Sequence, residues 1–249
     1  MQPIYKSPTP NPLPCFLLAA GRGERMRPLT DTTPKPLLQI QGKSLLQWHI
    51  EALVAANINR AVINHAWLGE QIELALGDGE KWGMQIQYSP EETALETAGG
   101  IRQALPLINP EPYFLVINGD VFCPGFPIAA FTSRFHAHLN SGTKPLAYLA
   151  LVPNPPQHLE GDFYLQGDRV SDKPITPQLQ ETKLTFSGIG IYHQSLFKDL
   201  QPGKPAKLAP LLRSAMAENH VFGEKYTGPW HDVGTPQRLH ELNQSYDPN

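Results

Sequence analysis

The chain has 249 residues, 41% of them hydrophobic, and so can bury one sizeable core. Its formal net charge of −3 provides no basic field for a nucleic-acid backbone, and no apolar run approaches the ~20 residues that span a bilayer. A small molecule is therefore the expected substrate, with neither nucleic acid nor membrane as a partner. Cys15 and Cys123 lie in or beside apolar stretches, which indicates buried thiols without a disulfide and a cytoplasmic location.

The first 14 residues, MQPIYKSPTPNPLP, are rich in proline. Prolines at this density disfavour the apolar segment of a signal peptide and leave the chain extended. We expect a flexible extension over residues 1–14 and a single domain over residues 15–249, because no internal repeat or second core is visible.

An apolar run, CFLLA, opens an alternation of strand-like and helical segments. In the first half of the chain, strands are expected at 15–19, 60–65, 84–89 and 113–117, and helices at 44–57, 68–77 and 99–107. Ser44 can cap the first of these helices. The alternation predicts an α/β fold with a mixed, mostly parallel sheet and helices on both faces.

Strands predominate after residue 145. They are expected at 146–152, 162–166, 183–193 and 222–228, with a helix at 207–219 and a last helix opened by Thr235 and Pro236. In an open α/β sheet, ligands bind beyond the carboxyl ends of the strands. The loops at 20–36 and 118–121 should therefore face one crevice.

A basic loop bracketed by glycines follows the first predicted strand, reading LAAGRGERMRPLTDTTPKP over residues 18–36. It is not a dinucleotide-binding fingerprint, because Met26 replaces the third glycine, and GKS at 42–44 is no Walker A motif, because Leu37 replaces the first glycine. Backbone amides of such a loop can still wrap phosphates, and its cations can neutralise them. The cations are Arg22, Arg25, Arg27 and Lys35. The pattern favours a triphosphate ligand.

This loop resembles the G-x-G-x-R-[ML]-x-P-L-T-x-x-x-P-K-P signature of the sugar-phosphate nucleotidyltransferases, which join a nucleoside triphosphate to a sugar 1-phosphate and release pyrophosphate. Further segments resemble the N-acetylmuramate α-1-phosphate uridylyltransferases of cell-wall recycling within that family. They read VINHAWLGEQIELALGDG, YSPEETALETAGGI, FLVINGDVF, GDFYL, LTFSGIGIYH, KLAPLLRSAM and WHDVGT. The resemblance covers residues 15 to about 245. It implies a Rossmann-like nucleotidyltransferase core that takes a nucleoside triphosphate, with UTP favoured, and a sugar 1-phosphate.

The resemblance also implies roles for the signature loop. Glycines let backbone amides approach the phosphates, an arginine binds the β/γ end, and a lysine stabilises the transferring α-phosphate. The implied nucleotide-binding residues are Ala20, Gly21, Gly23, Glu24, Arg25, Lys35, Gly99 and Gly100. Arg25, Lys35 and Asp120 are the implied catalytic residues. An ordinary strand-to-helix turn and a solvated lysine are the alternatives.

Two aspartates are candidate ligands for Mg²⁺. Asp120 follows a predicted strand in NGD, and Asp232 lies in WHDVGT before the last helix. One or two carboxylates together with phosphate oxygens form a suitable magnesium site, provided that the chain returns across the crevice. A turn and a helix cap are the alternatives for the two aspartates. Asn118 would then bind a substrate hydroxyl or phosphate.

The remaining candidates concern the base and the sugar. LETAGG at 95–100 resembles the loop that reads the nucleobase before a helix begins, although two glycines here are also compatible with a loop that binds nothing. By resemblance, Asp162 and Gly188 contact the sugar, whereas Lys173 is favoured as an ordinary charged loop residue. The histidines lack the spacing of a structural zinc site, so no zinc is expected.

Three functions are compatible with these observations. The first is a Mg²⁺-dependent uridylyltransferase, and the second is a related enzyme with glucose, mannose or another sugar phosphate and a different base. The third is a ligand-binding homologue without activity, which the intact set of Arg25, Lys35, Asp120 and Asp232 disfavours.

Overall fold

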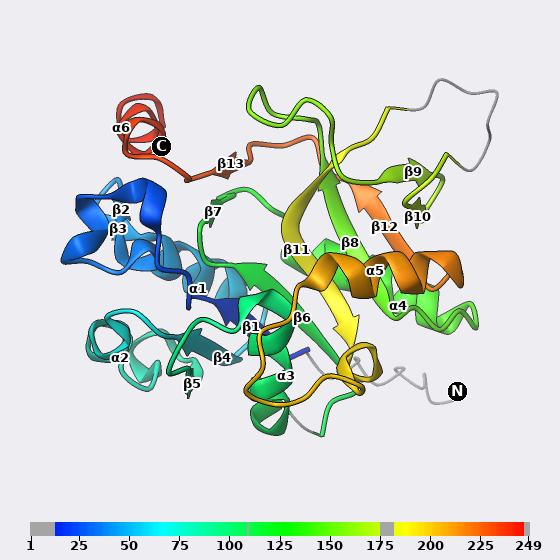
Figure 1. Cartoon of the computed structure of the whole chain (residues 1–249), viewed down its shortest axis with the longest axis horizontal. Helices are drawn as coiled ribbons and strands as arrows, with labels where there is room; N and C mark the ends of the chain where they lie inside the picture. Colours follow the sequence, from blue (N-terminus) through cyan, green and yellow to red (C-terminus); the bar gives the residue numbers. More distant parts are fainter. Residues whose placement is uncertain (1–12, 109, 175–181, 247–249) are drawn as a thin grey trace, which may run out of the picture.

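The computed structural model describes residues 13–108, 110–174 and 182–246. Within these ranges the chain forms one large sheet, two small two-stranded sheets and flanking helices (Figure 1). The strands are β1 (Cys15–Leu18), β2 (Gln39–Ile40), β3 (Lys43–Ser44), β4 (Arg60–His65), β5 (Gln85–Pro90), β6 (Tyr113–Asn118), β7 (Val121–Phe122), β8 (Ala147–Val152), β9 (Tyr164–Gln166), β10 (Arg169–Ser171), β11 (Thr185–His193), β12 (Val221–Lys225) and β13 (His231–Asp232).

The large sheet has nine strands in the order β5-β4-β1-β6-β11-β8-β12-β10-β9. Strands β5, β4, β1 and β6 pair in parallel, as do β8 and β12, while β11 and β10 pair antiparallel with both neighbours. Followed through these pairings, β11 and β10 run against the other seven strands. The predicted mixed, mostly parallel sheet is confirmed.

Six α-helices lie in the described ranges: α1 (Leu45–Ala55), α2 (Gly69–Leu76), α3 (Glu96–Ile108), α4 (Ile128–Asn140), α5 (Leu208–Ala217) and α6 (Pro236–Ser245). Apolar residues of α1, α2 and α4 pack on one face of the sheet, and those of α3 and α5 pack on the other. Alternate residues of β1 enter opposite cores, with Leu17 in the first and Phe16 in the second. Helices therefore cover both faces, as the sequence predicts.

A third, smaller core joins segments that are far apart in the sequence. Met26 of the glycine-bracketed loop is fully buried against apolar residues of β2, β7 and α6, including Phe122 and Leu239. In Figure 1, α6 lies above the β2–β3 hairpin, and it contacts β2. This core returns the end of the chain to the loop near its beginning.

Local signals place several elements correctly. Ser44 caps α1 by accepting a hydrogen bond from the backbone nitrogen of Gln47 at 3.1 Å. Thr235 caps α6 in the same way, with Pro236 as the first helical residue. No described helix is long and apolar enough to cross a membrane.

Three differences from the sequence prediction stand out. Helix α3 begins at Glu96, so the loop predicted at 95–100 is instead mostly the first turns of a helix. Helix α4 was not predicted, because its polar side carries two histidines and a serine that blur its period. The extension predicted over residues 1–14 lies largely outside the described residues, but Leu13 is buried and the carbonyl of Pro14 accepts a hydrogen bond from Leu115.

Candidate functional site

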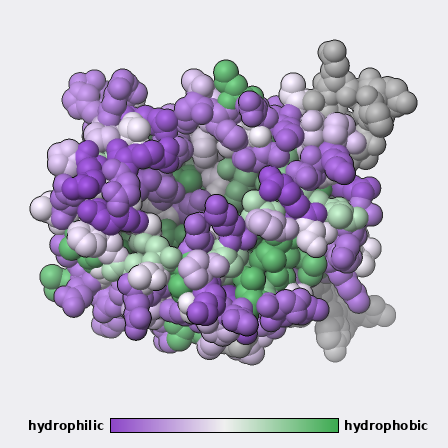
Figure 2. Space-filling model, in the orientation of Figure 1, coloured by the Kyte–Doolittle hydropathy of each residue, from purple (hydrophilic) through white to green (hydrophobic). Residues whose placement is uncertain are grey.

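A cavity of about 300 Å³ opens at the carboxyl ends of β1, β4 and β6. We call it the loop cavity, and its lining residues are Leu18, Ala19, Ala20, Gly21, Lys35, Pro36, Asn64, Ala94, Glu96, Thr97, Asn118 and Asp120. A second cavity of about 250 Å³, the α5 cavity, shares three of these residues and extends toward α5. The space-filling view is hollowed between the half with α1 and α2 and the half with α5 (Figure 2). The predicted crevice is therefore present.

The glycine-bracketed loop is folded tightly over its own backbone. Gly23 has φ of +69°, which a residue with a Cβ adopts only under strain, and a Cβ there would lie 3.0 Å from Thr30. The Thr30 hydroxyl donates a hydrogen bond to the carbonyl of Gly23 at 2.9 Å. Gly21, by contrast, has open space around it and lines the loop cavity. The two glycines therefore have different roles: Gly23 forms the turn and Gly21 lines the cavity.

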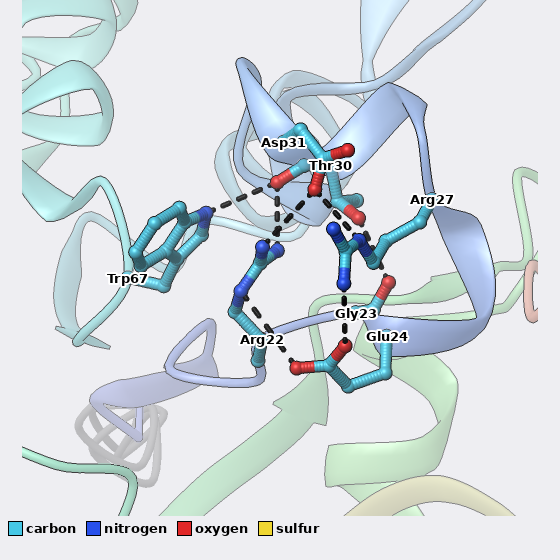
Figure 3. A network of polar contacts seen from close by, with 7 residues as sticks. All are labelled: Arg22, Gly23, Glu24, Arg27, Thr30, Asp31 and Trp67. Carbon is cyan, nitrogen blue, oxygen red and sulfur yellow. Dashed lines mark hydrogen bonds and ion pairs between the residues drawn. The ribbon is translucent and has the colours of Figure 1, made fainter.

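Arg22 is held within the loop by three groups (Figure 3). Its guanidinium donates to the carbonyl of Thr30 at 2.8 Å and to the carboxylate of Asp31 at 3.2 Å. The ring of Trp67, which lies in the connection between β4 and α2, stacks at 4.0 Å from the guanidinium carbon. The indole nitrogen of Trp67 donates to the same Thr30 carbonyl at 3.0 Å. Arg22 is therefore a structural cation that holds the loop together.

Arg27 is neutralised in a similar way. It lies 2.8 Å from Asp31 and 4.0 Å from Glu24, and Glu24 also lies 3.8 Å from Arg22 (Figure 3). Glu24 therefore faces the cations of its own loop. Arg25 is exposed, and no described residue makes a hydrogen bond or ion pair with it. Of the three arginines, Arg25 alone is left with its charge uncompensated by the described part of the chain.

Lys35 lies inside the crevice, with its side chain only 10% exposed. Its ammonium donates to the carboxylate of Asp120 at 2.6 Å. Pro34 and Pro36 flank it and restrict the backbone, so the side chain enters the cavity from a fixed origin. A buried ammonium paired with a half-exposed carboxylate forms a charged centre at the floor of the loop cavity.

The return of the chain brings the backbone next to Asp232 against the backbone of Asp120. Strand β13 pairs antiparallel with β7, and the backbone nitrogen of Val233 donates to the carbonyl of Asp120 at 3.0 Å. The Asp232 carboxylate accepts from the Arg238 guanidinium at 2.7 Å. The return across the crevice that a two-carboxylate site requires is thus observed, although Asp232 itself lines a neighbouring cavity of about 600 Å³.

These two carboxylates fit Mg²⁺ chemically, because the ion takes one or two protein carboxylates and completes its shell with phosphate oxygens and water. Among the described residues no group of three or more His, Cys, Asp or Glu side chains could hold a metal ion by itself. A magnesium ion at Asp120 and Asp232 would therefore depend on ligands from a bound phosphate.

His49 supports the strand that follows Asp120. It is buried, and its imidazole bonds to the backbone of Val121. Burial lowers the pKa of His49 to about 4, although the bond to Val121 and the nearby charge of Asp120 act in the opposite direction. The imidazole is therefore neutral at pH 7.

Asn64 and Glu91 form a buried network that the sequence does not reveal. The Asn64 side chain accepts from the backbone nitrogen of Ala19 at 2.8 Å and donates to Glu91 at 2.6 Å. The second carboxylate oxygen of Glu91 accepts from the nitrogen of Leu95 at 2.8 Å. The network joins the start of the glycine-bracketed loop to the segment before α3. Neither residue carries a local signal of this role, and only the pairing of β4 with β1 and β5 brings them together.

Gly99 and Gly100 are buried within α3 and do not line the loop cavity. A Cβ on Gly99 would lie 2.5 Å from the carbonyl of Lys204, and one on Gly100 would lie 2.7 Å from both Asn64 and Glu91. Close packing of α3 against these groups accounts for both glycines. The wall of the cavity at this point is formed by Ala94, Glu96 and Thr97 instead.

The residues predicted for the sugar lie around Asn118. Gly188 has φ of +80°, and a Cβ there would lie 2.8 Å from the Asn118 amide. The Asp162 carboxylate accepts from the backbone nitrogen of Phe186 at 2.8 Å and from His158 at 3.1 Å. Asp162 and Asn118 both line the α5 cavity. Lys173 is exposed outside it, as expected for a charged loop residue.

Comparison with known proteins gives a consistent match. The model of the nucleotidyl transferase family matches residues 15–248. The chain is 52% identical over 228 residues to the N-acetylmuramate alpha-1-phosphate uridylyltransferase of Neisseria meningitidis serogroup B, covering 91% of this chain and 95% of that protein. It is 32% identical to the enzyme of the same name from Caulobacter vibrioides, covering 89% and 92%.

More distant matches share the fold. A catalytic subunit beta of mannose-1-phosphate guanylyltransferase from Xenopus tropicalis is 30% identical, over 89% of this chain and 61% of that protein. The crystal structure of a Bacillus anthracis protein assigned as a glucose-1-phosphate thymidylyltransferase superposes with a TM-score of 0.78. It covers 95% of this chain and 97% of its own at 20% identity, so it shows the fold alone.

Proposed function

We propose that this chain, which belongs to the nucleotidyl transferase family, transfers the uridylyl group of UTP to N-acetylmuramate α-1-phosphate. The products are UDP-N-acetylmuramate, a cell-wall precursor, and pyrophosphate. Cell-wall recycling in the cytoplasm, where UTP is made, is the proposed setting. The observation that carries the proposal is the 52% identity, over nearly the full length of both chains, to the Neisseria enzyme of that name.

The charges of the crevice support nucleotidyl transfer. Both reactants are anions, so the enzyme must offset their repulsion and stabilise charge that develops at the α-phosphorus. Arg25 is the described loop arginine left free for the β- and γ-phosphates. Lys35 would lie at the α-phosphate, where a compact ammonium acts on the group being transferred. Asn118, Asp162 and Gly188 would hold the sugar.

In the proposed reaction, a phosphate oxygen of the sugar attacks the α-phosphorus in line, and the bond to the bridging oxygen of the β-phosphate breaks. Asp120 and Asp232 would hold the Mg²⁺, which supplies positive charge to the phosphate oxygens. The pair of Lys35 with Asp120 fixes the ammonium before the substrates enter, so little reorganisation is needed in the transition state.

The second candidate is transfer to glucose or mannose 1-phosphate from UTP, dTTP or GTP. It is favoured by the 30% identity to a mannose-1-phosphate guanylyltransferase subunit. A fold of this kind hosts many specificities, so the phosphate-binding residues do not separate the two candidates.

The test is a panel of nucleoside triphosphates crossed with sugar 1-phosphates, followed through pyrophosphate release with and without Mg²⁺. The proposal expects UTP with N-acetylmuramate α-1-phosphate to give the highest kcat/KM and chelation to abolish turnover. Equal turnover of glucose or mannose 1-phosphate would leave the family assignment intact and reject the muramate substrate.

A further inference from the structure

We infer that Lys207 determines specificity for the sugar by binding the lactyl carboxylate of the muramate substrate in the α5 cavity. This inference rests on the proposed function, because it concerns the group that distinguishes N-acetylmuramate from N-acetylglucosamine. The two sugars differ only by the lactyl ether on O3, which adds one carboxylate. An enzyme that prefers the muramate compound therefore needs a group that recognises this charge.

The α5 cavity supplies one such group. Its lining includes Lys207, Glu96, Asp162, Phe163 and Phe186. Among the described residues of this lining Lys207 is the only cation, and the other charged members, Glu96 and Asp162, are carboxylates. Without the lysine, the described lining would repel a sugar that carries an acid.

Lys207 is also free to bind. It is exposed, and no described residue accepts a hydrogen bond from its ammonium or pairs with it. This contrasts with Lys35, which is paired with Asp120, and with Asp162, which is already bonded to the backbone of Phe186. An ammonium at the mouth of a pocket loses little on binding an anion and gains a charge-assisted hydrogen bond.

The position of Lys207 is fixed by packing beneath it. The residue is the N-cap of α5, and the following Leu208 and Leu212 are buried in the core below the sheet. The cavity shares Glu96, Thr97 and Asn118 with the loop cavity, so one sugar phosphate can extend from the Lys35–Asp120 pair toward Lys207.

The test compares two substrates in three proteins: wild type, Lys207→Met and Lys207→Arg. Lys207→Met should lower kcat/KM for N-acetylmuramate α-1-phosphate by about 10-fold to 100-fold, the usual loss for a hydrogen bond to a charged group. Its kcat/KM for N-acetylglucosamine 1-phosphate should stay within about 3-fold of wild type, since that sugar has no carboxylate to lose. Lys207→Arg should retain most of the preference, because the charge is kept.

Lys204→Met is the matched control, because Lys204 is an exposed lysine of the preceding loop and is not part of the cavity lining. Equilibrium binding of the two UDP-sugars gives a second readout, and only UDP-N-acetylmuramate should bind Lys207→Met more weakly. A muramate preference that survives Lys207→Met, or an equal loss for both sugars, would overturn the role of Lys207 alone. A wild-type enzyme without any muramate preference would overturn the proposed function itself.

Discussion

The two ends of the crevice, the loop cavity and the α5 cavity, differ in how their charged side chains are paired. At the loop end, Arg25 is left for the substrate, but the other cations already pair with carboxylates: Arg22 and Arg27 with Asp31, and Lys35 with Asp120. At the α5 end, the described lining has a single free cation, Lys207, among apolar groups and two carboxylates. The loop end is therefore organised before substrate arrives, whereas the α5 end offers one charge for a group that only some sugars carry.

This difference separates chemistry from specificity. Preorganised pairs at the loop end suit any nucleoside triphosphate, since the phosphates are common to all of them. A few contacts at the α5 end can select one sugar over another without touching the reacting atoms. Substitutions at the two ends should consequently produce different kinetic signatures.

The largest effect is expected at the carboxylates of the loop end. Asp120→Asn and Asp232→Asn should each lower kcat by about 10³-fold or more while the protein stays folded, because each removes negative charge from the proposed Mg²⁺ site. The measurement is turnover across a magnesium titration. Asp199→Asn, at an exposed aspartate outside the cavities, is the control. Near-normal turnover of either variant at saturating Mg²⁺ would remove that aspartate from the metal site.

Lys35→Ala should have the second largest effect. We expect kcat to fall about 10²-fold or more and triphosphate affinity to change less. A charge directed at the transferring phosphorus acts mainly in the transition state. Single-turnover rates and triphosphate affinity, measured on the same variant, separate the two effects. If only the affinity changed, Lys35 would be a ground-state binding residue.

Gly188→Ala should affect the sugar and leave the triphosphate bound normally. The new methyl would lie 2.8 Å from the Asn118 amide and would have to displace it. We expect kcat/KM for the sugar phosphate to fall about 10-fold to 100-fold. Gly167→Ala is a matched control, because Gly167 also has a positive φ, of +62°, but a methyl added there would have no described neighbour within 4 Å. Equal losses in both variants would point to backbone strain alone.

His49 should make stability depend on pH. Its pKa is about 4 in the folded protein and 6.5 when unfolded, so the unfolded state binds more protons between these values. Stability from this residue is complete above pH 6.5, declines as the pH falls, and is lost below about pH 4. The full difference is about 3 kcal/mol. Denaturant titrations from pH 8 to pH 4 on wild type and His49→Gln would test this. If the free energy of unfolding depended on pH equally in both proteins, the prediction would be contradicted.

The smallest effect is expected from Trp67→Phe, which keeps an aromatic ring beside Arg22 but removes the hydrogen bond to the Thr30 carbonyl. One neutral hydrogen bond contributes about 1 kcal/mol, so KM for the triphosphate should rise about 3-fold to 8-fold through a looser loop. Trp82→Phe, at a tryptophan that contacts Lys81 outside this loop, should leave KM unchanged. An unchanged KM in Trp67→Phe would show that the loop is held without the indole.

The sequence reveals more of the loop end than of the α5 end, because the loop end depends more on signals between residues close in the sequence. Short-range signals made the alternation of strands and helices, the caps at Ser44 and Thr235, and the basic loop visible in the sequence. The approach of the backbone beside Asp232 to that of Asp120 depends on the pairing of β13 with β7, segments more than a hundred residues apart, which only the family resemblance could suggest.

The features that the local sequence does not reveal share the opposite property. Gly99 and Gly100 lie in α3, and the groups that they pack against, Lys204, Asn64 and Glu91, come from other parts of the chain. Lys207 carries no local signal either, since a lysine before a helix is common on protein surfaces. Its significance arises from the cavity that β11, α3 and α5 form together.

An internal competition assay tests the central claim most directly. Wild-type enzyme would receive UTP, Mg²⁺ and equal concentrations of N-acetylmuramate, N-acetylglucosamine, glucose and mannose 1-phosphates, and the UDP-sugars would be quantified by mass spectrometry. The account predicts that UDP-N-acetylmuramate exceeds every other product by at least about tenfold, the discrimination that one recognised charged group supplies. If UDP-N-acetylmuramate were no more abundant than the other UDP-sugars, the account would be contradicted.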